Sequence, residues 1–301
     1  MSTLKVNGIG IDEGFAEAFD MAATGVVITA DTAAWARQAA VTMTGFATSV
    51  IACGCEAGIE RTLSRRETPD GRPGVRVLLF AFNAELCAKA IVARVGQCVL
   101  TAPGTACFAG LPGGTPVKLG GALRYFGDGH QIAKQIDGRR YWRVPVMDGE
   151  FLVDHETYAV EGAVGGGNLL FLATSRAAAL AAAEAAVKAM KAVPGVIMPF
   201  PGGIVRSGSK VGSKYKGQPA STNDAYCPTL KGAVDSALGP DVAAVLEIVI
   251  DGLDFAAVQA AMRAGLHAAC ARGPGAGLLR VAAGNYGGKL GRHHFHLRDL
   301  L

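Results

Sequence analysis

The 301-residue sequence has few charged side chains and lacks a long apolar run. Charged residues make up 18% of the chain, and the mean hydropathy is +0.29. No stretch of about eighteen apolar residues occurs, so we expect no membrane-spanning helix. Residues 1–8 contain no apolar signal core, and on that ground we expect a cytoplasmic protein.

Aromatic side chains and basic clusters are also scarce. Only two tryptophans and six tyrosines are present, and the cations behind the net charge of +4 are dispersed or confined to one loop. Nucleic-acid binding typically uses a basic face with stacking aromatics, so the sequence disfavours it.

The seven cysteines form neither a disulfide framework nor a zinc motif. Their number is odd, and Cys53-Gly-Cys55 is not a CxxC pair. Most lie in apolar runs, and we interpret them as small core residues of a cytosolic protein. They are Cys53, Cys55, Cys87, Cys98, Cys107, Cys227 and Cys270.

The segment 199–226 has almost no large apolar side chains in a chain that is 50% hydrophobic. Its five glycines permit positive φ and close backbone approach, and its serines, Thr222 and Asn223 offer hydrogen bonds. A loop of this length inside a compact domain is usually functional or disordered. The regular placement of these residues favours a ligand-binding loop over a linker, and its cations suit an anionic ligand. These cations are Arg206, Lys210, Lys214 and Lys216.

Hydrophobic patterns and capping residues predict strands and helices that alternate in both halves of the chain. The predicted strands are 26–30, 48–52, 75–82 and 97–101, then 169–173, 196–198, 242–250 and 278–282. The predicted helices run from caps at Asp31 and Thr32 to Thr44, from Asn83 to Arg94, from Thr174 or Ser175 to about Ala192, and from Asp254 to Ala271.

The order of these elements repeats after about half the chain. We interpret the repeat as a duplicated βαββαβ unit, which predicts an α+β fold of two ferredoxin-like lobes, residues 1–150 and 151–301. Residues 102–168 hold extended pieces, including 123–126 and 141–146, and are expected to form a β-rich extension without a clear helix. The helices are apolar on much of their surface, which favours a homo-oligomer or a larger complex.

Glu247 is the candidate catalytic residue. It lies in a predicted strand where Val245 and Val249 share its face, and aliphatic residues occupy the other face. Apolar neighbours raise the pKa of a carboxyl group, and a carboxyl that keeps its proton near neutral pH can act as a general acid. The alternative is an edge-strand glutamate paired with a neighbouring lysine.

Other motifs are weaker. Residues 203–208 have the glycine spacing of a P-loop but continue Ser-Lys, so we reject a nucleotide site there. His293, His294 and His296 suggest a metal, yet no third ligand has suitable spacing, and a solvated terminal strand is favoured. Cys227 has no histidine nearby in sequence, which favours a packed thiol over a nucleophile.

Several long motifs occur together in one order. They are residues 14–19, 44–50, 67–75, 96–99, 101–103, 126–129, 199–205, 209–214, 219–228, 247–250 and 283–291. With these motifs the chain closely resembles the family of formylmethanofuran:tetrahydromethanopterin N-formyltransferases, nearly from end to end.

The resemblance implies reversible transfer of a formyl group between methanofuran, or an analogue, and tetrahydromethanopterin. It implies a fold of two ferredoxin-like lobes, and it implies that both coenzymes are co-substrates with no metal and no permanently bound cofactor. A homo-oligomer, typically a tetramer, is expected, with clefts near the subunit contacts. The glutamate proposed as catalytic in the family corresponds to Glu247.

We expect anions and ring edges of the coenzymes to be bound by residues of the glycine-rich loop and by one lysine near the C-terminus. The backbone amides of the first two glycines are also candidates to stabilise the negative charge of the tetrahedral species. The predicted substrate-binding residues are Pro201, Gly202, Gly203, Arg206, Ser207, Ser209, Lys210, Ser213, Lys214, Asn223, Asp224, Tyr226 and Lys289.

The net charge of +4 and the richness in Ala and Gly make the chain more similar to the version in bacterial methylotrophs than to the acidic methanogen members. The resemblance then implies a formyltransferase subunit in a complex with hydrolase subunits, running towards formylmethanofuran during formaldehyde oxidation to formate. Segments 53–66 and 108–124 depart from the archaeal pattern and are candidate partner contacts. The competing interpretations are a non-catalytic assembly or pterin-binding subunit, and a generic phosphate- or nucleotide-binding module.

Overall fold

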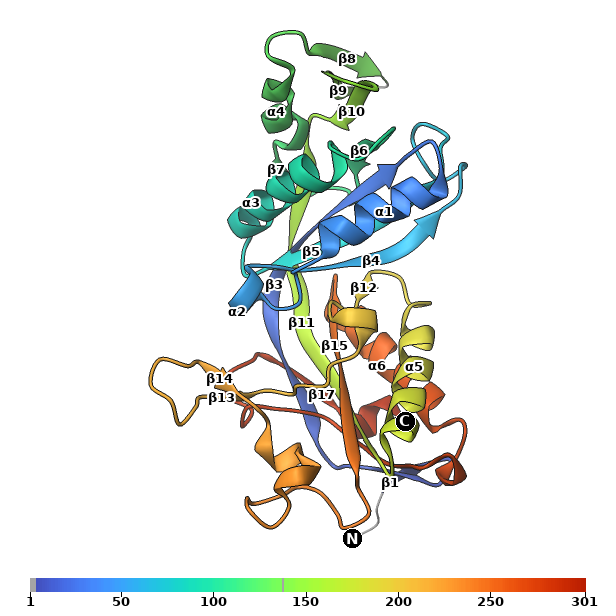
Figure 1. Ribbon diagram of the computed structural model, residues 1–301, viewed down its shortest axis with the longest axis vertical. Coiled ribbons are helices and arrows are strands. Elements are labelled where there is room, and N and C mark those ends of the chain that lie inside the picture. Colours follow the sequence, from blue (N-terminus) through green and yellow to red (C-terminus); the bar gives the residue numbers. More distant parts are fainter. Residues whose placement is uncertain (1–3, 137) are drawn as a thin grey trace. The chain divides into compact units, whose positions relative to one another are not determined.

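The computed structural model describes residues 4–136 and 138–301 (Figure 1). The chain forms two compact units. One contains the residues up to 20 together with 164–301, and the other contains 21–163. Each unit combines helices with antiparallel and parallel strand pairs, so the fold is mixed α and β. Among the described residues, no helix has both the length and the apolar character needed to span a bilayer.

The unit that holds 164–301 is built on four antiparallel strands in the order β16-β11-β15-β12. Its strands are β1 (Leu4–Val6), β2 (Ile9–Ile11), the start of β3 (Phe15–Thr29), the end of β11 (Thr157–Ala173), β12 (Val196–Ile197), β13 (Lys210–Val211), β14 (Ala220–Ser221), β15 (Ala244–Gly252), β16 (Leu278–Ala282) and β17 (His293–His296). Its helices are α5 (Arg176–Met190) and α6 (Phe255–Cys270). β2 extends this sheet parallel to β16, and β17 pairs with the start of β3.

The two helices of this unit begin at the caps that the sequence predicts. The side chain of Ser175 accepts a hydrogen bond from Ala178 N, and that of Asp254 accepts one from Ala257 N. Figure 1 shows α5 and α6 side by side next to β15. Their alanine-rich faces pack against Ile248 and Ile250 of β15 in the main core of the unit.

A different set of residues packs on the opposite face of β15. Leu170, Leu172 and Val242 form a small cluster there, against which Val245 and Tyr226 pack. The odd-numbered positions of β15 therefore face the long segment 199–243, and the even-numbered ones face the helices, as the two-residue period of the strand predicts. This alternation decides where Glu247 lies.

The unit of residues 21–163 has its four main strands in the order β6-β3-β5-β4, also antiparallel. Its strands are β4 (Glu56–Leu63), β5 (Gly74–Ala81), β6 (Ala106–Ala109), β7 (Thr115–Val117), β8 (Ile132–Ile136), β9 (Arg139–Val146) and β10 (Gly149–Asp154), with the rest of β3 and the start of β11. Its helices are α1 (Ala33–Thr44), α2 (Val50–Cys53), α3 (Ala84–Arg94) and α4 (Leu119–Leu123). Thr32 and Asn83 cap α1 and α3 through their side chains.

Three local predictions in this unit are wrong. Residues 48–52 are not a strand, because Glu56 accepts a hydrogen bond from Val50 N at 3.1 Å and helps to begin α2. Residues 97–101 are not extended either: α3 continues into a π-helical turn at Val95–Val99, and both of these valines are buried. The next strand is β6, several residues later.

The segment 123–126 is helical where a strand was predicted, so the expectation of an extension without a helix is also wrong. α4 runs directly into a 3-10 turn at Arg124–Gly127. The guanidinium of Arg124 lies 4.1 Å from the centroid of the Tyr125 ring and 5.1 Å from that of Trp142, a contact between distant segments that local patterns do not reveal. The prediction for 141–146 is confirmed by β9.

Candidate active site

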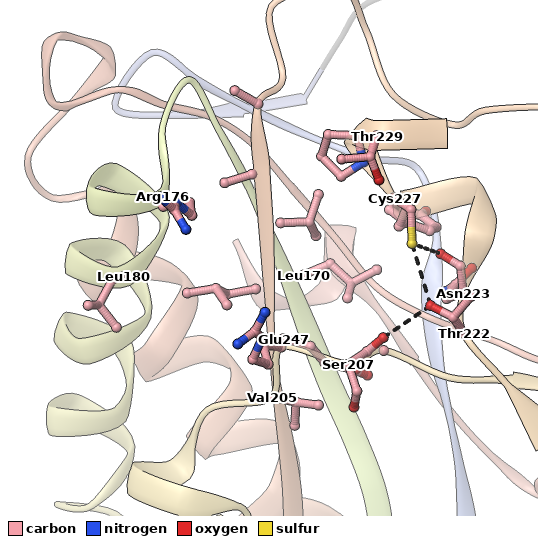
Figure 2. Close-up of a pocket in the computed structure, with 18 residues that line it drawn as sticks. Leu170, Arg176, Leu180, Val205, Ser207, Thr222, Asn223, Cys227, Thr229 and Glu247 are labelled. Atoms are coloured by element: carbon pink, nitrogen blue, oxygen red, sulfur yellow. Dashed lines mark hydrogen bonds between the residues drawn. The ribbon is translucent and has the colours of Figure 1, made fainter. Parts of the chain in front are cut away.

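A pocket of about 580 Å³ lies beside β15 in the unit of residues 164–301. Figure 2 shows β15 between two walls: Arg176 and Leu180 project from α5, and Thr222, Asn223 and Cys227 lie on the loop opposite. The full lining is Leu170, Arg176, Leu180, Val205, Arg206, Ser207, Gly208, Thr222, Asn223, Tyr226, Cys227, Pro228, Thr229, Ala243, Ala244, Val245, Leu246 and Glu247.

Glu247 is held in this pocket by backbone pairing on both sides. It lies opposite Leu170 in the β11–β15 ladder. On its other edge, Glu247 N donates to Val205 O at 2.9 Å, and Val205 N donates to Glu247 O at 2.7 Å. The strand position thus fixes the backbone of Glu247, while its half-buried side chain is free to meet a ligand.

Burial raises the pKa of Glu247 to about 7. No hydrogen bond or ion pair joins its carboxyl group to another residue in the described part of the chain, so the alternative of a lysine-paired edge glutamate does not hold. A carboxyl with this pKa is protonated in a large fraction of molecules at neutral pH and can donate a hydrogen bond or a proton.

The loop wall is fixed by contacts between its two ends. Thr222 Oγ1 donates to Ser207 O at 3.4 Å, and Cys227 Sγ donates to Asn223 O at 3.4 Å, as drawn in Figure 2. Gly208 has a φ of +60°, and a Cβ atom there would lie 3.3 Å from Asn223 Cβ. The glycine therefore allows the two ends of the loop to approach closely.

The middle of the loop forms a small hairpin of β13 and β14. Lys210 Nζ lies 2.6 Å from Asp224 Oδ2, and this hydrogen bond lowers the pKa of Asp224. Ser221 Oγ donates to Gly212 O at 2.7 Å. Lys210 and Asp224 thus neutralise each other at the base of the hairpin.

The structure gathers five of the predicted site residues in one pocket: Arg206, Ser207, Asn223, Tyr226 and Glu247. Burial raises the pKa of the Tyr226 phenol, which therefore stays protonated as a donor. The other predicted residues lie outside the lining. Pro201, Gly202 and Gly203 form a 3-10 turn before it, Ser209, Lys210, Ser213, Lys214 and Asp224 belong to the hairpin region, and Lys289 is exposed in another loop.

The loop that carries Lys289 is anchored by Glu17, which sequence reasoning missed. This glutamate is 0% exposed, and its carboxylate accepts hydrogen bonds from four backbone N–H groups. The donors are Tyr286, Gly288, Leu290 and Gly291, at 2.6–2.8 Å. Burial opposes ionisation, but these four donors outweigh it and lower the pKa of Glu17.

Sequence reasoning also missed Arg176, Leu180 and Thr229, which line the pocket. Thr222 was counted in the candidate loop without a site role, and Cys227 was interpreted as a packed thiol, but both line the pocket too. For Arg176 and Leu180 the only available signal was the repeated βαββαβ order, which places a helix beside the strand of Glu247. The predicted terminal strand of histidines is confirmed as β17, although its rings are half-buried rather than solvated. His293 Nε2 lies 2.8 Å from Asp20 Oδ1, and the rings of His294 and His296 contact Phe15.

Comparison with known proteins assigns the chain to one family. Residues 4–146 match the family model for formylmethanofuran-tetrahydromethanopterin formyltransferase, and residues 149–300 match the model for its proximal lobe. The chain belongs to this formyltransferase family. It is 62% identical to a subunit of the formyltransferase/hydrolase complex of Methylorubrum extorquens, over 100% of this chain and 98% of that protein.

Two solved formyltransferase structures are similar over the whole chain. The crystal structure of the formyltransferase/hydrolase complex from Methylorubrum extorquens with methylofuran gives a TM-score of 0.97 at 63% identity, covering 100% of this chain and 99% of that one. The formyltransferase from Methanosarcina barkeri gives a TM-score of 0.94 at 46% identity, covering 99% of this chain and 100% of that one. The higher identity to the bacterial protein agrees with the resemblance to the methylotroph version of this formyltransferase.

Proposed function

We propose that this chain transfers a formyl group between tetrahydromethanopterin and methanofuran or an analogue, towards formylmethanofuran during formaldehyde oxidation to formate. Membership of the formyltransferase family supports the reaction. The observation that carries the mechanism is Glu247, a carboxyl group with a pKa of about 7 that faces a pocket wide enough for a coenzyme arm. A crystal structure of a relative contains methylofuran, which supports the class of acceptor.

The reaction forms one C–N bond and breaks another. The acceptor nitrogen attacks the formyl carbon, and negative charge develops on the formyl oxygen of the tetrahedral species. The bond to the donor nitrogen then breaks. The proton released by the attacking nitrogen is balanced by the proton that the leaving nitrogen takes up.

Glu247 is suited to two of these events. In its protonated form it donates a hydrogen bond to the developing oxyanion, an interaction typically worth about 3 kcal/mol in the transition state. It then passes its proton to the leaving nitrogen and recovers one from the attacking nitrogen. The backbone amide of Gly203 is a poorer donor for the oxyanion, because its N–H already donates to Phe200 O at 2.8 Å.

The remaining lining residues are suited to positioning. Arg206 supplies a cation for a carboxylate or phosphate, and Ser207, Asn223 and Tyr226 supply hydrogen bonds for ring edges and linkers. Holding two coenzymes in line removes much of the entropic barrier to the transfer. The hairpin residues Ser209, Lys210, Ser213, Lys214 and Asp224, the turn Pro201, Gly202 and Gly203, and Lys289 are proposed to act outside the pocket, on the more distant parts of the coenzymes.

The test is formyl transfer by the purified chain with both coenzymes, compared with Glu247→Gln. The glutamine variant keeps the shape of the side chain but has no proton to exchange, so we expect kcat to fall by roughly 1,000-fold with unchanged thermal stability. Activity of the variant close to that of the natural chain would reject the role of Glu247. An inactive natural chain that still binds the pterin would instead support the alternative, a non-catalytic assembly or pterin-binding subunit.

We also propose that the chain works in the cytoplasm and holds no permanently bound cofactor. Its assembly is proposed to be a homo-oligomer, a complex with hydrolase subunits, or both. The relative from Methylorubrum extorquens is named as one subunit of a formyltransferase/hydrolase complex, which supports the hetero-complex. Native mass spectrometry of the protein purified from its own cells decides between these assemblies and detects any tightly bound group.

We further propose that the fold is a duplication of ferredoxin-like lobes. Both units support this, because β11-α5-β12-β15-α6-β16 and β3-α1-β4-β5-α3-β6 follow the same βαββαβ order, with the fourth, first, third and second strands adjacent in the sheet. A lobe boundary near residue 150 is supported by the family models, which end at 146 and begin at 149. Separately produced fragments 1–146 and 149–301 that each unfold cooperatively would agree with that boundary, and fragments that do not fold alone would reject it.

A further inference from the structure

Three charged side chains line the pocket beside β15: Glu247, Arg206 and Arg176. Both arginines are exposed residues. Among the hydrogen bonds and ion pairs of the described residues, none joins either guanidinium group to another side chain or to the backbone. By contrast, Lys210 in the neighbouring hairpin is paired with Asp224. Within the described part of the chain, the pocket thus carries two guanidinium groups that have no ion-pair partner.

Neither cation forms an ion pair with Glu247 among the described residues. The pKa of Glu247 is raised, and burial is the cause. Both guanidinium groups therefore remain available to a ligand that enters the pocket.

Arg176 is placed on the pocket wall by the start of α5. It is the first residue of this helix, directly after the cap Ser175, and Leu180 follows four residues later on the same helix face and lines the same pocket. Figure 2 shows both side chains on the side of β15 opposite the loop residues Thr222 and Asn223. Arg206 belongs to the loop segment that pairs with β15 through Val205. The two cations thus come from different elements.

We propose that Arg176 is a substrate-binding residue that, with Arg206, binds a carboxylate or phosphate arm of one coenzyme and so sets which coenzyme enters this pocket. The inference rests on the proposed formyl transfer for the identity of the ligand. Guanidinium groups bind carboxylates and phosphates through charge-assisted, often bidentate hydrogen bonds, and unpaired arginines in a pocket leave that capacity available. A neutral ligand would leave both cations without a partner.

The experiment compares Arg176→Met, Arg176→Lys and the matched control Lys188→Met. Lys188 lies on the same helix, is exposed and does not line the pocket. KM and kcat are measured for methanofuran and for tetrahydromethanopterin separately. For Arg176→Met we expect KM for one coenzyme to rise roughly 10- to 100-fold with kcat little changed, because a charge-assisted hydrogen bond is lost in the ground and transition states alike. Arg176→Lys restores part of the loss, and Lys188→Met changes neither constant.

Two further measurements identify which anionic group is bound. A coenzyme fragment that lacks its carboxylate or phosphate arm should have the same KM with the natural chain and with Arg176→Met. Salt screens the attraction between the Arg176 guanidinium group and the anion, so the KM of the natural chain should rise with salt concentration. The KM of Arg176→Met should rise less, because the variant lacks this charge. KM values of Arg176→Met within twofold of the natural chain for both coenzymes would overturn the proposal.

A binding measurement separates this inference from the proposed reaction. In a Glu247→Gln background, the dissociation constant of each coenzyme is measured by calorimetry with and without Arg176→Met. Weaker binding in the double variant supports the anion site even if the natural chain transfers no formyl group. Unchanged binding in the double variant, with an active natural chain, rejects the anion site and leaves the reaction standing.

Discussion

Glu247 and Val205 exchange both of their backbone hydrogen bonds, at 2.9 and 2.7 Å. This bridge joins the strand that carries the acid to the loop that carries Arg206 and Ser207. The bridge therefore fixes the position of the loop residues Arg206 and Ser207 relative to Glu247 on the strand. The loop is long and rich in glycine, and this bridge is one of the contacts that tie it to the reacting centre.

The bridge predicts a specific effect of proline at position 205. Val205→Pro removes the N–H that donates to Glu247 O, so the loop separates from β15 and the binding groups move away from the acid. We expect kcat/KM to fall by roughly 100-fold, the scale of a misplacement of about 1 Å. Val205→Ala keeps the backbone donor and should retain most of the activity at moderate temperature. Equal activity of the two variants would show that the bridge does not position the site.

The pKa of Glu247 predicts the pH dependence of formyl transfer. The protonated acid is the active form in the proposed mechanism, so kcat should fall as pH rises through about 7. Below that pH the acid is already protonated, and the rate should change little on its account. Glu247→Gln cannot titrate, and its residual rate should lose this step. Profiles of kcat from pH 5 to 9 for both proteins check the prediction, and a step that persists in the variant must come from another group.

Glu17 predicts a stability effect away from the pocket. Glu17→Gln replaces a charged acceptor of four N–H groups with an amide that can accept through one oxygen only, so we expect a loss on the order of 3 kcal/mol in the free energy of unfolding. The pKa of Glu17 is lowered in the folded state, so its contribution is present above the unfolded pKa and disappears as pH falls through the folded one. Urea unfolding of both proteins at neutral and acidic pH should therefore show a smaller difference in acid.

The loop anchored by Glu17 leaves no room for a side chain at position 291. A Cβ atom on Gly291 would lie 2.3 Å from Ala18 O, a backbone atom that cannot move aside. Gly291→Ala should lower the free energy of unfolding by about 1–3 kcal/mol. Gly275→Ala is the control, since a Cβ atom there meets nothing within 4 Å. Thermal unfolding of the two variants tests this, and an unaffected Gly291→Ala would mean that the loop can shift at little cost.

The elements that carry strong local signals were predictable from the sequence. Ser175 and Asp254 are capping residues followed by apolar helices, and both helices begin where these residues predict. The two-residue period of β15 predicted that Glu247 and Ile248 lie on opposite faces of the strand. Ile248 faces the helices, and the apolar clusters on the two faces confirm that alternation. Glu247 could be chosen as a candidate because a carboxyl group is costly to place among aliphatic residues unless it has a function.

The errors arose where a distant partner decides the local structure. Glu56 accepts a hydrogen bond from the first turn of α2 although it lies beyond the end of that helix, and Trp142 of β9 packs on Arg124 of the 3-10 turn, so short windows around these segments mislead. The loop cations show the same limit. Lys210 is a residue type that often binds anionic ligands, but the folded hairpin pairs it with Asp224. Arg176 lines the pocket only because α5 packs beside β15.

The most direct test of the account measures the proton on Glu247 itself. Infrared difference spectra of the natural chain minus Glu247→Gln, recorded across pH 4 to 9, isolate the carboxylic acid band of this one side chain. The account predicts that the band persists at neutral pH and disappears with a midpoint near the pKa of about 7 set by burial. A midpoint at the ordinary value of 4.5 would contradict it, because the group would then carry no proton to give at the pH of the reaction.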